Sequence, residues 1–149
     1  MLTPWYVTGF CEGAATFTYS KSGGSFSLYF SIRQKQDNRQ AVEEIYQFFQ
    51  HSGTLYNQRG GLPAKNSAQA KTSIYYRVTR PYELKLIIEH FDQYPLQNKK
   101  KLEAYNIWRE MVRHKLNNYR KIDYDKLRAL ADKLSSLNLQ SRVFKVHSK

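Results

Sequence analysis

Two short stretches of the sequence carry side chains that could do chemistry on a phosphate group. Residues 4–17 hold one carboxylate, Glu12, and residues 99–101 are three consecutive lysines. A carboxylate can hold a divalent cation, and a lysine ammonium can neutralise a phosphate oxygen. These groups are therefore candidate contacts for a cation and for a phosphate.

The histidines and the single cysteine offer no competing centre. Cys11 alone can form neither an intramolecular disulfide nor a zinc site built from cysteines, which indicates a reducing compartment. The histidines have no metal-ligand spacing and no nearby nucleophile signature, so we expect surface or helix-end positions for His51, His90, His114 and His147.

A short helix must position Glu12. Pro4 suits the first turn of a helix, and Gly13 lies where that helix should end. Gly9 and Gly13 are four residues apart, so one face of the helix has no side chains and could let a second helix approach closely. The alternative interpretation is an ordinary capped helix with a solvated Glu12.

Residues 7–15 resemble the nine-residue motif of the LAGLIDADG homing endonucleases. The small residues Thr8 and Gly9, the acidic Glu12 and the small Gly13 fall where that family has them. One position departs from the pattern, because Ala14 stands where the family has its metal-binding carboxylate. Residues 94–100 resemble the second signature of the family, Y-P-L-x-x-x-K. Together the two signatures indicate the single-motif, homodimeric type.

Strand patterns lie between the two signatures. Residues 16–22 and 25–35 alternate around a Gly23-Gly24 turn, and residues 54–59 and 71–79 form a second pair. Hydroxyl, tyrosine and arginine side chains on one sheet face could contact bases and phosphates. We assign to this DNA-binding face Thr16, Thr18, Ser20, Ser22, Ser25, Ser27, Tyr29, Ser31, Arg33, Lys35, Tyr56, Gln58, Lys71, Ser73, Tyr75 and Arg77. The alternative interpretation is that this face of the sheet contacts only solvent.

The remaining segments have helical spacing of apolar residues. We predict helices from an Asp37 N-cap to His51 and from Pro81 to Tyr94. A turn at 94–100 leads into a long helix that runs through about Lys115, and a last helix covers about 123–136. A loose basic tail follows at 140–149. The result is one α+β domain over residues 1–149 with a core at about 4–115. Its order resembles the αββαββα fold of the family, with a four-stranded antiparallel saddle and extra C-terminal helices.

The charge of the chain favours a polyanionic partner. Lys and Arg number 24 against 12 Asp and Glu, which gives a net charge of +12 over 149 residues. Nucleic acid is the leading candidate and an anionic membrane surface the second. No apolar run approaches 18 residues and no secretory signal is visible, so we expect no membrane association and an intracellular location, in a bacterial cytoplasm or an organelle.

The resemblance implies a homodimer that reads a pseudo-palindromic double-stranded DNA site in the major groove. Thr8, Gly9, Glu12 and Gly13 would form the dimer interface. A divalent metal ion, Mg2+ with Ca2+ or Mn2+ as substitutes, would bind the carbonyl of Gly13 and the side chain at position 14. The other implied roles are catalysis by Lys100 and Gln34, phosphate contacts by Lys99 and Lys101, and a structural brace by Glu12 beside the catalytic centre.

Three functions therefore remain open. The first is a site-specific endonuclease that cuts poorly because of Ala14, whether that alanine is natural or replaces Glu or Asp. The second is a non-cutting binding protein on the same fold, an intron maturase with intron RNA as a partner or a transcription regulator. The third is a general basic domain that binds RNA or ribosomes without sequence preference.

Overall fold

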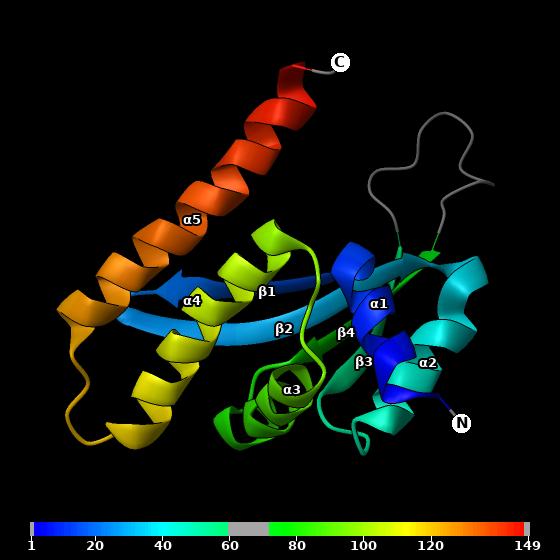
Figure 1. Ribbon diagram of the computed structural model, residues 1–149, viewed down its shortest axis with the longest axis horizontal. Helices are drawn as coiled ribbons and strands as arrows, with labels where there is room; N and C mark the ends of the chain where they lie inside the picture. Colours follow the sequence, from blue (N-terminus) through cyan, green and yellow to red (C-terminus); the bar gives the residue numbers. More distant parts are fainter. Residues whose placement is uncertain (1, 60–71, 148–149) are drawn as a thin grey trace.

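The computed structural model describes residues 2–59 and 72–147. Its element order is the predicted one, αββαββα followed by further helices. Figure 1 shows the elements, whose bounds are α1 (Pro4–Ala14), β1 (Ala15–Ser22), β2 (Ser25–Lys35), η1 (Gln36–Asn38), α2 (Arg39–Phe48), β3 (Thr54–Arg59), β4 (Thr72–Val78), α3 (Pro81–Gln93), α4 (Lys99–Asn117) and α5 (Tyr124–His147).

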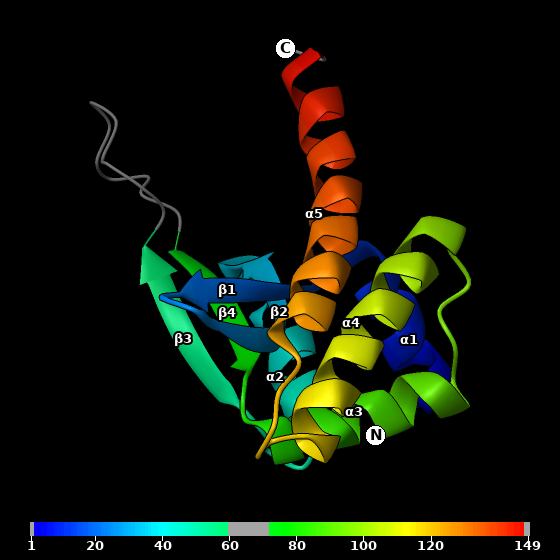
Figure 2. The same ribbon diagram turned by 90° about the vertical axis from the view of Figure 1, so that its left-hand side faces the viewer.

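The four strands form one antiparallel sheet in the order β1-β2-β4-β3. Helices α1, α3 and α4 lie on one side of this sheet, as Figure 2 shows, and α2 contacts β2 and β4. Because strand side chains alternate between the two faces, every second residue of a strand points toward the helices. The predicted inward residues Ile74, Tyr76 and Val78 are all buried.

Aromatic side chains fill the space between the sheet and the helices. Phe17 of β1 lies at the centre, with its ring centroid 5.3 Å from that of Phe91, 5.1 Å from Tyr105 and 5.1 Å from Trp108. The buried Trp108 donates its indole N–H to the carbonyl of Thr18 at 3.1 Å. These contacts hold α3 and α4 against β1, so the opposite face of the sheet is left for other contacts.

Several predicted helix boundaries are wrong. Asp37 is not an N-cap, because it lies inside the 3-10 turn η1 and α2 starts only at Arg39. The predicted end at His51 is also too late: Gln50 and His51 both have a φ of 59° and turn the chain toward β3. Gly13 is not the left-handed end of α1, since the helix runs through Ala14 and enters β1 directly.

Helix α5 is longer than predicted. The sequence predicts an end near residue 136 and a loose basic tail at 140–149, whereas α5 reaches His147. Neither glycine nor proline occurs between Tyr124 and His147, so nothing in the sequence interrupts the helix. None of the helices described between residues 2 and 147 is both long and apolar enough to cross a membrane.

Candidate nucleic-acid interface and metal position

The polar residues assigned to the sheet face line up across the strands. Thr16 pairs with Ser31, Ser31 with Arg77, and Arg77 with Thr54, so one row crosses all four strands. A second row joins Arg33, Tyr75 and Tyr56, and a third joins Lys35, Ser73 and Gln58. Partners directly opposite in antiparallel strands have their side chains on the same face. The fold thus brings both hairpins into one polar platform, defined here as these three rows with Thr18 and Tyr29.

Two arginines of the platform stack on tyrosine rings. The guanidinium carbon of Arg77 lies 3.9 Å from the ring centroid of Tyr29, and that of Arg33 lies 5.0 Å from Tyr75. Such stacking restricts the arginine side chain while its N–H groups stay directed outward. Arg33 is exposed, whereas Arg77 is half-buried and its Nε has no hydrogen-bond partner among residues 2–59 and 72–147. Arg33 is therefore the more accessible donor.

Not every assigned residue is accessible to a ligand. Ser31 is only 8% exposed, because it lies between Thr16 and Arg77 in the first row. Lys71 lies outside the described residues. Exposed members of the predicted set are Thr16, Ser20, Ser22, Ser25, Ser27, Arg33, Lys35 and Tyr56.

A polar hollow of about 450 Å³ lies at the outer end of the platform, where Thr54 and Arg77 pair. Glu83 also lines this hollow, and its carboxylate accepts a hydrogen bond from the backbone N–H of Gly53 at 3.1 Å. The side chains around the hollow include Ser27, His51, Thr54, Tyr56, Arg77 and Arg80. Its arginines make this end of the platform suitable for an anion such as a phosphate.

Glu12 acts as a brace between two helices. Its carboxylate accepts hydrogen bonds from the backbone N–H groups of Gln97 and Asn98, the second at 3.0 Å. These residues directly precede α4, so Glu12 joins the end of α1 to the start of α4. The structural role implied by the resemblance agrees with this geometry, whereas a contact of this carboxylate across a dimer interface does not.

The junction of α1 and β1 does not fit a divalent metal ion. Position 14 carries a methyl group, and the nearest acidic side chain, Glu12, is engaged with backbone N–H groups. Among the described residues there is no group of three or more His, Cys, Asp and Glu side chains that could hold a metal. The Gly13 carbonyl alone is a weak ligand, because Mg2+ is normally held by one or two carboxylates.

Lys101, rather than Lys100, reaches this junction. The Nζ of Lys101 donates a hydrogen bond to the carbonyl oxygen of Ala15, while Lys99 and Lys100 are exposed. Burial holds the pKa of Lys101 below its ordinary value, an effect that nearby Cys11 and Glu12 oppose. The phosphate contact of Lys101 stays a prediction, with one of its ammonium donors already bonded to Ala15. The structure gives no contact of Lys100 to Ala14.

Gln34 lies at the end of β2 and on the helix side of the sheet. It pairs with the buried Ile74, and its Oε1 accepts a hydrogen bond from the side-chain amide of Asn38 at 2.9 Å. The pairing of Ala15 with Ile32 places the α1–β1 junction beside this end of β2. Gln34 is thus near the junction along the strand, but not on the platform.

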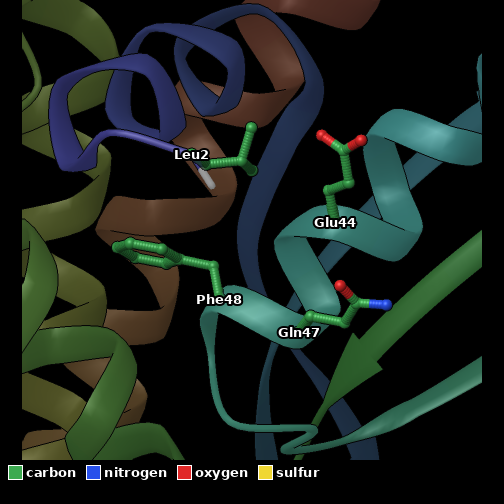
Figure 3. A pocket seen from close by; sticks show the side chains of 4 residues that line it. All are labelled: Leu2, Glu44, Gln47 and Phe48. Atoms are coloured by element: carbon green, nitrogen blue, oxygen red, sulfur yellow. The ribbon is translucent and has the colours of Figure 1, made fainter.

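The outer face of α1 is apolar and exposed. Trp5 is 54% and Tyr6 49% exposed. An added Cβ at Gly9 or Gly13 would have no atom within 4 Å. Beside the start of α1 is a further hollow of about 490 Å³, where Leu2 faces α2 above Phe48 (Figure 3). Within the chain, the two glycines and the two aromatic side chains of this face are therefore left uncovered.

Thr8 does not belong to that face, which corrects its assignment to the dimer interface. The residue is 2% exposed, and its Oγ1 donates to the carbonyl of Tyr94 at 2.8 Å and lies 3.0 Å from Nε2 of His90. A threonine has a single hydroxyl hydrogen, so with that hydrogen on Tyr94 the histidine Nε2–H must be the donor to Thr8.

The surface or helix-end position predicted for His90 is wrong. It is 7% exposed rather than on the surface, and burial lowers its pKa to about 4. Its ring centroid lies 4.7 Å from that of Phe91 and 5.4 Å from that of Phe49. The spacing from Ile87 to His90 to Tyr94 is helical, and this signal could have placed the histidine on the inner face.

Comparison with known proteins gives one family and one fold. A family model described as LAGLIDADG endonuclease matches residues 7–112, more than half of the chain. The family consists of DNA endonucleases. No curated protein was found that matches the chain.

Solved structures share the fold at low identity. The homing endonuclease I-GzeII in complex with its DNA target has a TM-score of 0.68 and 21% identity, over 92% of this chain and 44% of that one. I-SmaMI, bound to uncleaved DNA with calcium ions, has a TM-score of 0.76 and 20% identity, over 91% of this chain and 46% of that one. The archaeal intron-encoded I-Vdi141I, complexed with DNA, has a TM-score of 0.71 and 23% identity, over 90% of this chain and 82% of that one.

The chain thus spans less than half the length of the first two of these proteins and most of the length of the third. The family match agrees with the two sequence signatures and with the four-stranded antiparallel sheet. The chain belongs to the LAGLIDADG endonuclease family.

Proposed function

We propose that this chain binds a pseudo-palindromic double-stranded DNA site as one of two units that meet through α1, and that it cleaves this DNA poorly. The observation that carries the proposal is the platform, where hydroxyl, tyrosine and arginine side chains form one row across all four strands and two further rows across β2, β4 and β3. Side chains of these types can contact base edges and phosphates in the major groove. The similar proteins I-GzeII, I-SmaMI and I-Vdi141I were each solved with DNA.

The second unit would be another copy of this chain. The apolar face of α1, with its two bare glycines, supports a helix pair with close backbone approach. A two-fold axis between the glycine faces repeats the platform in the opposite direction, so the preferred DNA site is a pseudo-palindrome.

Poor cleavage follows from position 14. A methyl group cannot coordinate a cation, and without a held metal the attacking water and the phosphate lose their main source of charge stabilisation. The alternative is that cleavage is no part of the function and that the platform serves a maturase or a regulator. This alternative rests on the same methyl group, and it predicts sequence-specific binding as well.

Selection of bound duplexes from a random pool tests the proposal directly. We expect enrichment of a single motif with two-fold symmetry, bound by a dimer. Enrichment of no motif, together with a steep loss of affinity as salt is raised, would contradict site-specific recognition and favour a general basic domain.

Single substitutions test the assignment of the platform. Arg33→Ala should relax base preference at particular positions and cost about 1–3 kcal/mol of binding free energy there. Lys99→Ala, a change on the exposed first turn of α4, should weaken binding to all DNA sequences alike. Competition between the selected duplex and its single-base variants measures both effects. Equal effects of the two substitutions on every duplex would contradict base readout by Arg33.

A further inference from the structure

We infer that Trp5 of each copy in the proposed dimer inserts into the hollow between the start of α1 and helix α2 of the other copy. This inference rests on the proposed function, in which two copies pair through α1. The hollow has a volume of about 490 Å³ and is lined by Leu2, Glu44, Gln47 and Phe48.

Helix α1 has two different flanks. On one flank, the ring of Trp5 meets the ring of Tyr94 edge to face, at a centroid distance of 5.2 Å, and Glu12 binds the N–H of Asn98 before α4. On the other flank, Leu2 faces α2 across the hollow (Figure 3). Figure 1 shows the same division, with α3 and α4 on one side of α1 and α2 on the other. Trp5 therefore does not fill the hollow of its own chain.

A two-fold axis brings these opposite flanks together. Both platforms must face the same duplex, and α1 runs directly into β1 of the platform, so the two copies of α1 point in the same direction along the axis. A rotation of 180° about an axis parallel to a helix places each flank of one copy against the opposite flank of the other. The flank with Trp5 of one copy thus faces the flank with the hollow of the other, and this contact occurs twice.

The hollow offers what an indole ring needs. Leu2 and Phe48 supply apolar side chains, and Glu44 and Gln47 supply oxygen acceptors for the indole N–H, which needs a partner when it is buried. One oxygen of Glu44 accepts a hydrogen bond from the side-chain amide of Gln40 at 3.1 Å, and a carboxylate can accept several such bonds. Since an apolar cavity of roughly 150 Å³ can hold a benzene ring, the volume of the hollow does not prevent entry.

Trp5 has the features of an interface anchor. Its side chain is 54% exposed in the single chain, although one edge of the ring is already held by Tyr94. This contact restricts the indole before assembly, so less conformational entropy is lost when the second copy binds. Tryptophan is also among the residue types that contribute most to the binding free energy of protein interfaces.

Fluorescence tests the burial of Trp5. The chain has two tryptophans and Trp108 is 0% exposed, so a change in emission on assembly reports on Trp5. As the protein concentration is raised through dimerisation, we expect the emission to shift to shorter wavelength and quenching by acrylamide to fall. Unchanged emission and quenching in a dimeric protein would overturn the inference.

Substitutions on the two flanks test the contact itself. Trp5→Ala should raise the Kd of the dimer about a hundredfold, because two contacts worth about tenfold each are lost. Gln47→Trp fills the hollow from an exposed position and should weaken the dimer as well. The controls Tyr119→Ala and Ala129→Trp remove or add an exposed aromatic ring elsewhere and should dimerise like the wild type. Thermal unfolding checks that each variant is folded.

A mixture of the two interface variants tests whether Trp5 and the hollow meet across the dimer. A heterodimer of Trp5→Ala and Gln47→Trp keeps one intact Trp5 opposite one open hollow, while the filled hollow lies opposite the alanine. We therefore expect the mixture to associate about tenfold more tightly than either variant alone, because one of the two contacts is restored.

A mixture that associates no better than either variant alone would overturn the inference. So would a Gln47→Trp protein that dimerises like the wild type, which would leave the hollow to another ligand. A Trp5→Ala protein with undiminished dimerisation contradicts this inference alone, since pairing through the glycine face would persist. A wild-type protein that binds the palindromic duplex as a monomer would contradict the proposed function and this inference together.

Discussion

His90 shows how one buried side chain can hold α1 in place. It donates from Nε2 to Thr8 of α1, and Thr8 donates to the carbonyl of Tyr94 just after α3. Three polar groups are thereby satisfied in a region that is otherwise aromatic. Since leaving a buried donor or acceptor without a partner costs about 1–3 kcal/mol, this short chain of hydrogen bonds fixes the orientation of α1 on α3.

The lowered pKa of His90 predicts an acid-sensitive stability. The unfolded chain takes up this proton near pH 6.5 and the folded chain only near pH 4. The unfolded state therefore binds more protons between these values, and the free energy of unfolding falls as the pH is lowered through this interval, by about 3 kcal/mol in all. Urea unfolding at a series of pH values measures the slope.

A glutamine at position 90 keeps hydrogen-bonding capacity and removes the titration. His90→Gln should therefore flatten the pH dependence between pH 6.5 and 4. His51→Gln, at an exposed position, controls for the loss of a histidine elsewhere. An unchanged slope in His90→Gln would show that other groups cause the acid sensitivity.

At the level of elements, the contact between α1 and α4 couples α1 to the three lysines at the start of α4. Glu12 comes from the last turn of α1, and its two hydrogen-bond partners lie 85 and 86 residues away in the sequence. Asn98 then caps α4 through Lys101. A change in the position of α4 relative to α1 would therefore move the ammonium of Lys101 at the α1–β1 junction.

Removal of the Glu12 carboxylate should loosen this coupling. We expect Glu12→Ala to lower the free energy of unfolding by about 1–3 kcal/mol, because two backbone N–H groups lose a charged acceptor. Glu12→Gln retains an acceptor oxygen and should cost less. Glu103→Ala removes an exposed carboxylate of α4 and serves as the control. Equal stability of all three variants in urea unfolding would contradict the brace.

At the scale of the whole molecule, one chain of the proposed dimer presents half of the surface that a symmetric DNA site needs. The apolar face of α1 is exposed in the chain, with Trp5 and Tyr6 about half accessible. A second unit on this face would cover these aromatics and set two platforms side by side. The affinity for DNA would then depend on assembly as well as on the platform.

Gly9→Leu separates folding from assembly. A Cβ at Gly9 meets no atom within 4 Å inside the chain, so the variant should fold at least as well as the wild type, because leucine favours helices by about 1 kcal/mol over glycine. It should nevertheless be monomeric and lose affinity for the palindromic duplex. Gly24→Leu, at a similarly open position in the β1–β2 turn, should remain dimeric. Sedimentation at several concentrations measures both, and a dimeric Gly9→Leu would place the interface elsewhere.

Much of the platform could be predicted from the sequence because its cause is local. Side chains alternate along any strand, so Ser73, Tyr75 and Arg77 had to lie on one face and Ile74 and Tyr76 on the other. Likewise the missing carboxylate at Ala14 follows from the motif alone. The end of α5 was missed because the predicted stop rested on the last apolar residues rather than on a helix-breaking residue.

The sequence by itself determined the family, the element order, the polar face and the absence of a metal-binding side chain at position 14. Only the tertiary structure decided that Lys101 points inward, that Thr8 faces His90 rather than a partner, and that His90 is buried. Three adjacent lysines are chemically alike, so their sequence cannot rank them. The rotation of α4 about its axis separates them, and that rotation is set by contacts with α1 that join residues distant in the chain.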